Sequence, residues 1–109
     1  MIQATFHMEG RDIVSFQVEG HSGLGSAGND VLCAAVTSAV RLTECAVNDV
    51  LGLEASVKVK PEKALISLKL PGGLGQTNES TCQTLMAALM VYFTQLQEEY
   101  PDNIIVMEV

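Results

Sequence analysis

The chain has 109 residues and a net charge of −7, and these values exclude several kinds of protein. This length predicts one domain, residues 1–109, with a single site and no room for separate cofactor and substrate lobes. Only 6 Lys and Arg oppose 13 Asp and Glu, which argues against direct nucleic acid binding and favours a basic partner. Many soluble domains are simply acidic, so the charge is equally compatible with no such partner. Hydrophobic residues make up 48% of the chain, so we expect folding without a metal ion or disulfide.

The first two predicted elements form a β-hairpin. Apolar residues alternate with polar ones from Ile2 to Met8 and again from Val14 to Val18, which is the pattern of half-buried strands. The polar residues 9–12 between them form a turn.

A glycine-rich loop from Gly20 to Asn29 leads into a predicted helix that runs from Val31 to about Leu51. Asn29 or Asp30 is a natural N-cap residue, because a short acceptor side chain satisfies a free N–H of the first turn. Apolar residues surround most of this helix, which predicts burial on more than one side and a central place in the fold.

The second half repeats the order of hairpin, glycine-rich loop and helix. We expect strands from Ala55 to Val59 and from Ala64 to Leu70, and an amphipathic helix from about Asn78 to Tyr100. The last strand, Ile104 to Val109, has apolar residues on both faces, which predicts a position inside the sheet. The sequence therefore predicts an α/β domain of the α+β type with the order ββαββαβ. Its mostly antiparallel sheet packs against a central helix and an amphipathic second helix.

The three cysteines, Cys33, Cys45 and Cys82, form no CxxC or other metal-ligand spacing, and we expect free thiols. Cys45 and Cys82 have no histidine nearby in the sequence, so we expect both to be structural and slow to alkylate. Met1 leads straight into a strand, and no apolar run looks long enough to span a bilayer. These features favour a cytoplasmic protein without a membrane partner.

Gly20 to Val36 is the stretch in which chemistry is concentrated. Gly23 to Gly28 spells GxGxxG, but the preceding hairpin is not the βαβ unit of a dinucleotide-binding loop. His21, Asp30 and Cys33 also offer metal-ligating atoms, although not in the usual doublet spacing.

A thiol nucleophile with a histidine partner is the third interpretation. Cys33 lies in the first helical turn, where free N–H groups and the helix dipole lower the pKa of a thiol. His21, across the loop, is in a position to pair with it. The alternative is that Cys33 is a small buried apolar residue and His21 an ordinary loop residue, and residue types alone favour this alternative.

One motif resembles a known family along the whole chain. The order Gly20-His21-Ser22-Gly23, then Gly28, Asp30, Cys33-Ala34-Ala35-Val36 and Thr37 or Ser38, resembles the signature of the ribosomal-processing cysteine proteases of Firmicutes and their relatives. The resemblance implies a cytoplasmic, homodimeric endopeptidase without a cofactor or metal. Its substrate would be the precursor of the large-subunit ribosomal protein numbered twenty-seven, which loses a short N-terminal extension during ribosome assembly.

The resemblance also implies roles for single residues. His21 would be the catalytic base and acid, Cys33 the nucleophile, and an apolar pocket nearby would hold the aromatic residue before the cleaved bond. Asp30 either orients His21 or caps the helix, and its position just before the helix favours capping. The predicted substrate loop, which can close over the substrate, contains Ser22, Gly23, Gly25 and Gly28. A noncatalytic ribosome-associated or protein-binding module of the same fold is the alternative function.

Overall fold

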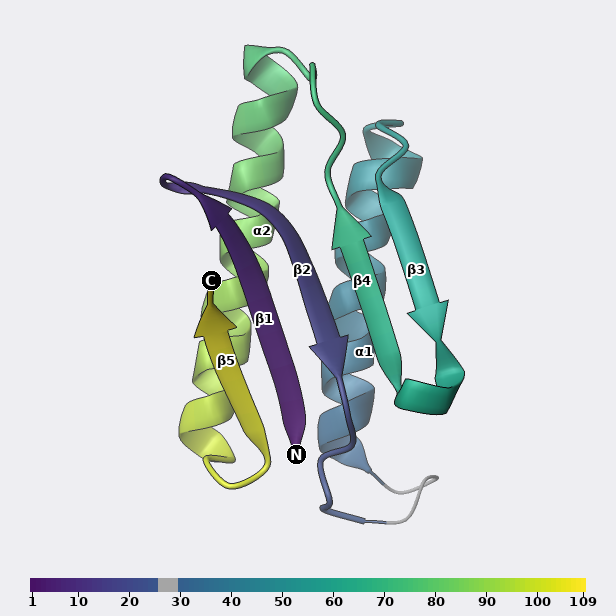
Figure 1. Cartoon of the computed structure of the whole chain (residues 1–109), viewed down its shortest axis with the longest axis vertical. Helices are drawn as coiled ribbons and strands as arrows, with labels where there is room; N and C mark the ends of the chain where they lie inside the picture. Colours follow the sequence, from purple (N-terminus) through teal and green to yellow (C-terminus); the bar gives the residue numbers. More distant parts are fainter. Residues whose placement is uncertain (26–29) are drawn as a thin grey trace.

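The computed structural model describes residues 1–25 and 30–109, and it arranges them in two layers (Figure 1). One layer is a five-stranded sheet, and the other holds two helices that lie on the same face of the sheet. The strands are β1 (Ile2–Glu9), β2 (Asp12–Glu19), β3 (Ser56–Lys60), β4 (Leu65–Lys69) and β5 (Ile104–Glu108). Helix α1 (Val31–Glu44) continues as a π-helix over Cys45–Val50, and α2 spans Gln76–Glu99. The predicted α+β fold, with its ββαββαβ order, is confirmed.

The strand order across the sheet is β3-β4-β2-β1-β5. Strand β5 pairs with β1 in parallel, and the other neighbouring strands pair antiparallel. The prediction that the last strand lies inside the sheet is wrong, because β5 is an edge strand. Only one face of β5 is buried, although apolar residues occupy both: Ile104 lies in the core, whereas Ile105 is 37% exposed. Apolar residues on both faces of a strand therefore do not prove that the strand lies inside the sheet.

The core lies between the sheet and the helices, and aromatic rings form its centre. The ring of Phe6 on β1 lies 5.8 Å from that of Phe16 on β2 and 6.1 Å from that of Phe93 on α2, measured between centroids. All three rings are fully buried. The chain has no Trp and only these three Phe residues, so all of its Phe side chains pack between the two layers.

Helix α1 buries one stripe of side chains, and the prediction of burial on more than one side is wrong. Leu32, Val36 and Val40 are buried at intervals of four residues, whereas Leu42 is 71% and Val50 77% exposed. Counting apolar residues overestimates burial here, because the sheet covers only one side of the helix.

By length and composition the segment Val31–Val50 is also able to cross a membrane, contrary to the expectation that no run is long enough. A core helix meets the same criteria, and the buried stripe belongs to the core.

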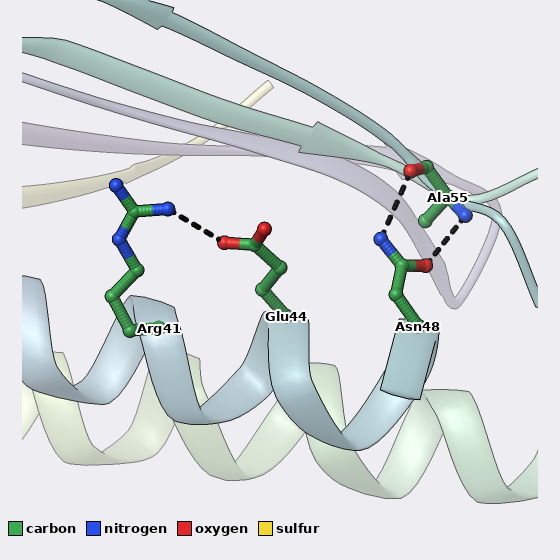
Figure 2. A network of polar contacts seen from close by, with 4 residues as sticks. All are labelled: Arg41, Glu44, Asn48 and Ala55. Carbon is green, nitrogen blue, oxygen red and sulfur yellow. Dashed lines mark hydrogen bonds and ion pairs between the residues drawn. The ribbon is translucent and has the colours of Figure 1, made fainter. Parts of the chain in front are cut away.

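The C-terminal end of the first helical segment is held by Asn48 (Figure 2). Its side-chain amide donates to the Ala55 carbonyl over 3.1 Å, and the Ala55 N–H donates to Asn48 Oδ1 over 2.7 Å. One turn earlier, Arg41 forms a 2.9 Å ion pair with Glu44. The paired bonds of Asn48 fix where the chain leaves the helical layer to begin β3.

The three cysteines have different environments. Cys82 on α2 is fully buried in the core, as expected of a structural residue. Cys45, at the start of the π-helix, is exposed, so the expectation of a shielded structural thiol is wrong for this residue. Cys33 is intermediate between them.

Candidate active site

A cavity of about 560 Å³ lies between α1, the loop after β2 and the turn between β3 and β4. His21, Asp30 and Cys33 all line this cavity. Much of the remaining wall is apolar and includes Val18, Val36, Val59, Pro61 and Ile66. The structure therefore places the three predicted chemical residues around one space, next to an apolar surface of the kind expected for the side chain of a substrate.

Gly20 fixes the point where the loop leaves β2. Its φ is +98°, and a Cβ at this position would overlap the Met1 carbonyl oxygen. Its N–H donates to the Ala64 carbonyl in the β3–β4 turn over 3.2 Å. Glycine is required here because a side chain fits neither the backbone conformation nor the space.

Asp30 is the N-cap residue of α1, and its carboxylate is occupied by two donors. One oxygen accepts the Cys33 N–H over 2.9 Å, and the other accepts the Ser22 hydroxyl. These bonds, that from Cys33 first, lower the pKa of Asp30 from 3.8 to about 2. In the part of the chain that the structure describes, no hydrogen bond joins Asp30 to His21. The geometry is thus that of a helix cap and gives no contact for orienting the imidazole.

Cys33 lines the cavity, and its surroundings favour the neutral thiol over the thiolate. Burial raises the pKa of the Cys33 thiol above its ordinary value, and the neighbouring Asp30 side chain raises it further. The Ser22 N–H, 3.4 Å from Cys33 Sγ, acts in the opposite direction. The position in the first helical turn predicted a lowered pKa, and this prediction is wrong for the present conformation. The helix N–H nearest to the sulfur in sequence, that of Cys33 itself, is bound by Asp30.

His21 is exposed and lines the same cavity as Cys33. Among residues 1–25 and 30–109, no hydrogen bond connects its imidazole to the thiol. The cavity therefore brings the two side chains to one place but does not hold them in contact.

The predicted substrate loop is divided between two roles. Gly23 and Gly25 line the cavity, but Ser22 is only 2% exposed and is bonded on several sides. Gly28 lies outside the described residues. In the described ranges no three His, Cys, Asp or Glu side chains cluster as metal ligands do, so geometry gives the metal interpretation no support. The loop also follows an antiparallel hairpin, which does not match a dinucleotide-binding unit.

Several residues at the site were missed by sequence reasoning. Asn103, to which the sequence pattern assigned no role, donates from its side chain to the Ser22 carbonyl over 2.8 Å. No pattern links two residues that are 81 positions apart. Arg41 also lines the cavity, as does Thr37, which the resemblance had already placed in the motif, and here a signal existed. They follow Cys33 at intervals of four residues, which places them on the same face of the helix.

Comparisons with known proteins identify the family that the chain resembles. A protein-family profile described as cysteine protease Prp matches residues 1–105. A Bacillus subtilis protein named ribosomal processing cysteine protease Prp is 28% identical over 105 residues, covering 95% of this chain and 94% of the relative.

Two solved structures show the same fold. A ribosomal processing protease Prp from S. aureus, in complex with a covalently linked product peptide, superposes with a TM-score of 0.83 at 19% identity, and all of both chains is covered. A Streptococcus mutans protein gives a TM-score of 0.85 at 24% identity and covers 100% of this chain and 94% of its own. At these identities the structures establish the fold alone.

Proposed function

Because the chain belongs to the Prp family of ribosomal processing cysteine proteases, we propose that it is an endopeptidase with Cys33 as nucleophile and His21 as general base and acid. The observation that carries the proposal is that both side chains line one cavity with largely apolar walls. A thiol and an imidazole are the pair that acyl transfer to sulfur requires. The apolar wall provides a place for the substrate side chain next to the cleaved bond.

The proposed reaction has two steps. In the first, His21 takes the proton of the Cys33 thiol as sulfur attacks the carbonyl carbon, and then gives it to the departing amine. In the second, His21 takes a proton from water, whose oxygen attacks the thioester carbonyl carbon. The C–S bond breaks to release the carboxylic acid end of the product, and His21 returns the proton to sulfur to restore the thiol. The raised pKa of Cys33 keeps the resting residue neutral. We infer that substrate binding brings the imidazole within hydrogen-bonding reach of the sulfur.

We propose that the substrate is the precursor of the large-subunit ribosomal protein numbered twenty-seven, which loses a short N-terminal extension during ribosome assembly. The name of the B. subtilis relative supports a ribosomal substrate. The apolar cavity suits an aromatic side chain before the cleaved bond. A net charge of −7 also favours encounter with a basic polypeptide rather than with nucleic acid.

Cleavage of a peptide tests this proposal. The protein is incubated with a peptide that spans the extension of the precursor, and the products are identified by mass spectrometry. We expect cleavage after an aromatic residue by the wild type and by Cys45→Ala, because Cys45 is exposed and does not line the cavity. Cys33→Ala and His21→Ala should not cleave. An intact peptide that still binds the wild type would instead favour the noncatalytic binding module.

We also propose a homodimer that meets through the outer side of the helical layer. A groove of about 440 Å³ runs between α1 and α2, and its lining includes Leu42, Leu85 and Tyr92 but no charged residue. In a protein with a net charge of −7, an uncharged face allows two copies to meet with little repulsion. Sedimentation velocity should detect a dimer that Leu42→Asp dissociates. Val50→Asp, which changes an equally exposed residue outside the groove, should leave it intact.

The proposed location is the cytoplasm, where thiols stay reduced. The support is chemical: Cys33, Cys45 and Cys82 are all free, and the proposed mechanism needs a reduced Cys33. Imaging of the protein fused to a fluorescent reporter tests this, and a signal confined to the cell envelope would contradict it.

A further inference from the structure

Ser22 connects the predicted catalytic residues to the rest of the fold. Its hydroxyl donates to Asp30 and accepts the Leu24 N–H over 3.1 Å. Its own N–H points at Cys33 Sγ over 3.4 Å, and its carbonyl accepts the Asn103 side chain over 2.8 Å. Ser22 is thus held at three atoms, and the residue before it is His21.

Asn103 reaches Ser22 from a rigid part of the chain. It lies between α2 and β5, and its N–H donates to the Tyr100 carbonyl over 3.0 Å. Its carbonyl accepts the Ile2 N–H over 2.9 Å, next to the point where β1 and β5 begin to pair. Because its backbone is fixed on both sides, its side-chain amide is presented to the loop from a defined position.

We propose that Asn103 is a positioning residue for the thiol chemistry: by holding the Ser22 carbonyl, it keeps the Ser22 N–H directed at Cys33 Sγ and fixes the backbone from which His21 projects. This inference rests on the proposed function, in which Cys33 is the nucleophile. The Ser22 carbonyl and the Ser22 N–H extend from the same Cα, so losing the bond to Asn103 removes one of the anchors of this residue and loosens the position from which its N–H reaches the sulfur. A hydrogen bond from this N–H favours the thiolate over the thiol.

The hydrogen bond from the Ser22 N–H matters because it affects the charge state of the Cys33 sulfur. Burial and Asp30 both raise the pKa of Cys33, and the Ser22 N–H lowers it. An N–H donor therefore offsets part of the cost of forming the thiolate that attacks the substrate. Asn103 acts through Ser22 and touches neither the sulfur nor the substrate.

The test compares Asn103→Ala and Asn103→Asp with the wild type. Asp keeps the size of Asn but carries no N–H donor toward the Ser22 carbonyl. The alkylation rate of Cys33 by iodoacetamide is measured against pH by mass spectrometry, together with kcat and KM for the cleaved peptide. We expect the apparent pKa of Cys33 to rise and its alkylation rate at pH 8 to fall roughly 3- to 10-fold, as for one lost hydrogen bond. In cleavage, kcat should fall with little change in KM.

Asn48→Asp is the matched control. Asn48 also holds a backbone carbonyl through its side-chain amide, at the other end of the first helical segment (Figure 2). It should lower thermal stability and leave the Cys33 pH profile unchanged. An unchanged profile in folded Asn103 variants would overturn the proposal, and so would an equal shift in Asn48→Asp.

Two features keep the test decisive. If the Asn103 variants do not fold, hydrogen exchange of the wild-type Ser22 amide replaces them: protection supports the proposal, and exchange at the rate of an unstructured loop rejects it. Alkylation also needs no substrate. Failure of the proposed function appears as cleavage that survives Cys33→Ala or as no cleavage at all, whereas failure of this inference appears in the Cys33 profile.

Discussion

The two halves of the chain begin alike and differ at their cysteines. Gly23-Leu24-Gly25 precedes α1 and Cys33, and Gly73-Leu74-Gly75 precedes α2 and Cys82. Helix α2 starts directly after Gly75 without a side-chain cap, and Cys82 points into the core. Helix α1 starts after a longer loop with Asp30 as its cap, and Cys33 faces a cavity.

Both thiols have a pKa raised by burial, but only Cys33 has an N–H donor directed at its sulfur among the described residues. A cysteine near the start of a helix is therefore not reactive by position alone. Three features distinguish the candidate nucleophile Cys33 from the core residue Cys82. They are the Asp30 cap, the loop whose Ser22 N–H reaches the sulfur, and the cavity beside the sulfur. The predictions below test this difference between the two halves.

The largest expected effect is on catalysis. Cys33→Ser should lower kcat/KM for the peptide by at least about 10³-fold, because a hydroxyl is a far weaker nucleophile without a strong base. Cys82→Ala should leave kcat/KM unchanged and lower the free energy of unfolding by about 1 kcal/mol, because it leaves a small cavity in the core. Peptide cleavage and urea denaturation measure the two effects. Equal kcat/KM losses in both variants would remove the distinction between the halves.

Replacing glycine by alanine should lower the free energy of unfolding more in the loop before α1 than in the loop before α2. Gly20→Ala should cost about 3 kcal/mol, because its φ is +98° and the new Cβ would overlap the Met1 carbonyl. Gly73→Ala should cost only about 1 kcal/mol, because φ is +70° but no atom lies within 4 Å. Urea denaturation gives both values. A Gly73 variant as unstable as the Gly20 variant would mean that backbone conformation alone sets the cost.

Thiol accessibility should follow the environments of the three cysteines. At pH 7 we expect Cys45 to alkylate first because it is exposed, then Cys33, and Cys82 last because it is buried. Raising the pH should accelerate Cys33 more than Cys82, because the thiolate is the reactive form and the cavity admits the reagent to Cys33 alone of these two thiols. Mass spectrometry of native protein at timed intervals measures the order. A Cys82 that reacts as fast as Cys33 would show that the core opens readily.

The smallest expected effect is the pH dependence of the α1 cap. Folding lowers the pKa of Asp30 from 3.8 to about 2, so the ionised cap stabilises the fold at pH values above ~4. That contribution is lost as the pH falls through about 2. Asp30→Asn keeps a capping acceptor but does not titrate, so its melting temperature should fall less between pH 4 and pH 2 than that of the wild type. Identical pH dependence in both proteins would mean that Asp30 is not held as the structure indicates.

The sequence predicts local structure well in this protein and long-range contacts poorly. Alternation and helical spacing gave the order of the elements, and a short acceptor before an apolar run gave the cap at Asp30. These features depend on neighbouring residues. The edge position of β5 depends instead on which strand is already paired, because β2 occupies the other side of β1.

The site shows the same limit. The residue types in the loop and first helical turn, together with the resemblance to a family signature, single out His21, Asp30 and Cys33, which line one cavity. The upward shift of the Cys33 pKa depends first on burial in the folded protein, which the position of Cys33 in the first helical turn does not predict. The contact between Asn103 and Ser22 depends on how α2 returns the chain to β1, which no local pattern encodes.

The position of Gly20 against Met1 has a practical consequence for protein engineering. The Met1 backbone lies against Gly20, and both Gly20 and Ile2 line the cavity, so a purification tag fused to Met1 would emerge beside the cavity. Strand β5 runs parallel to β1 and carries the C-terminus toward the opposite end of the sheet. Affinity handles, fluorophores and surface tethers are therefore better attached after Val109, because none of the residues of β5 lines the cavity.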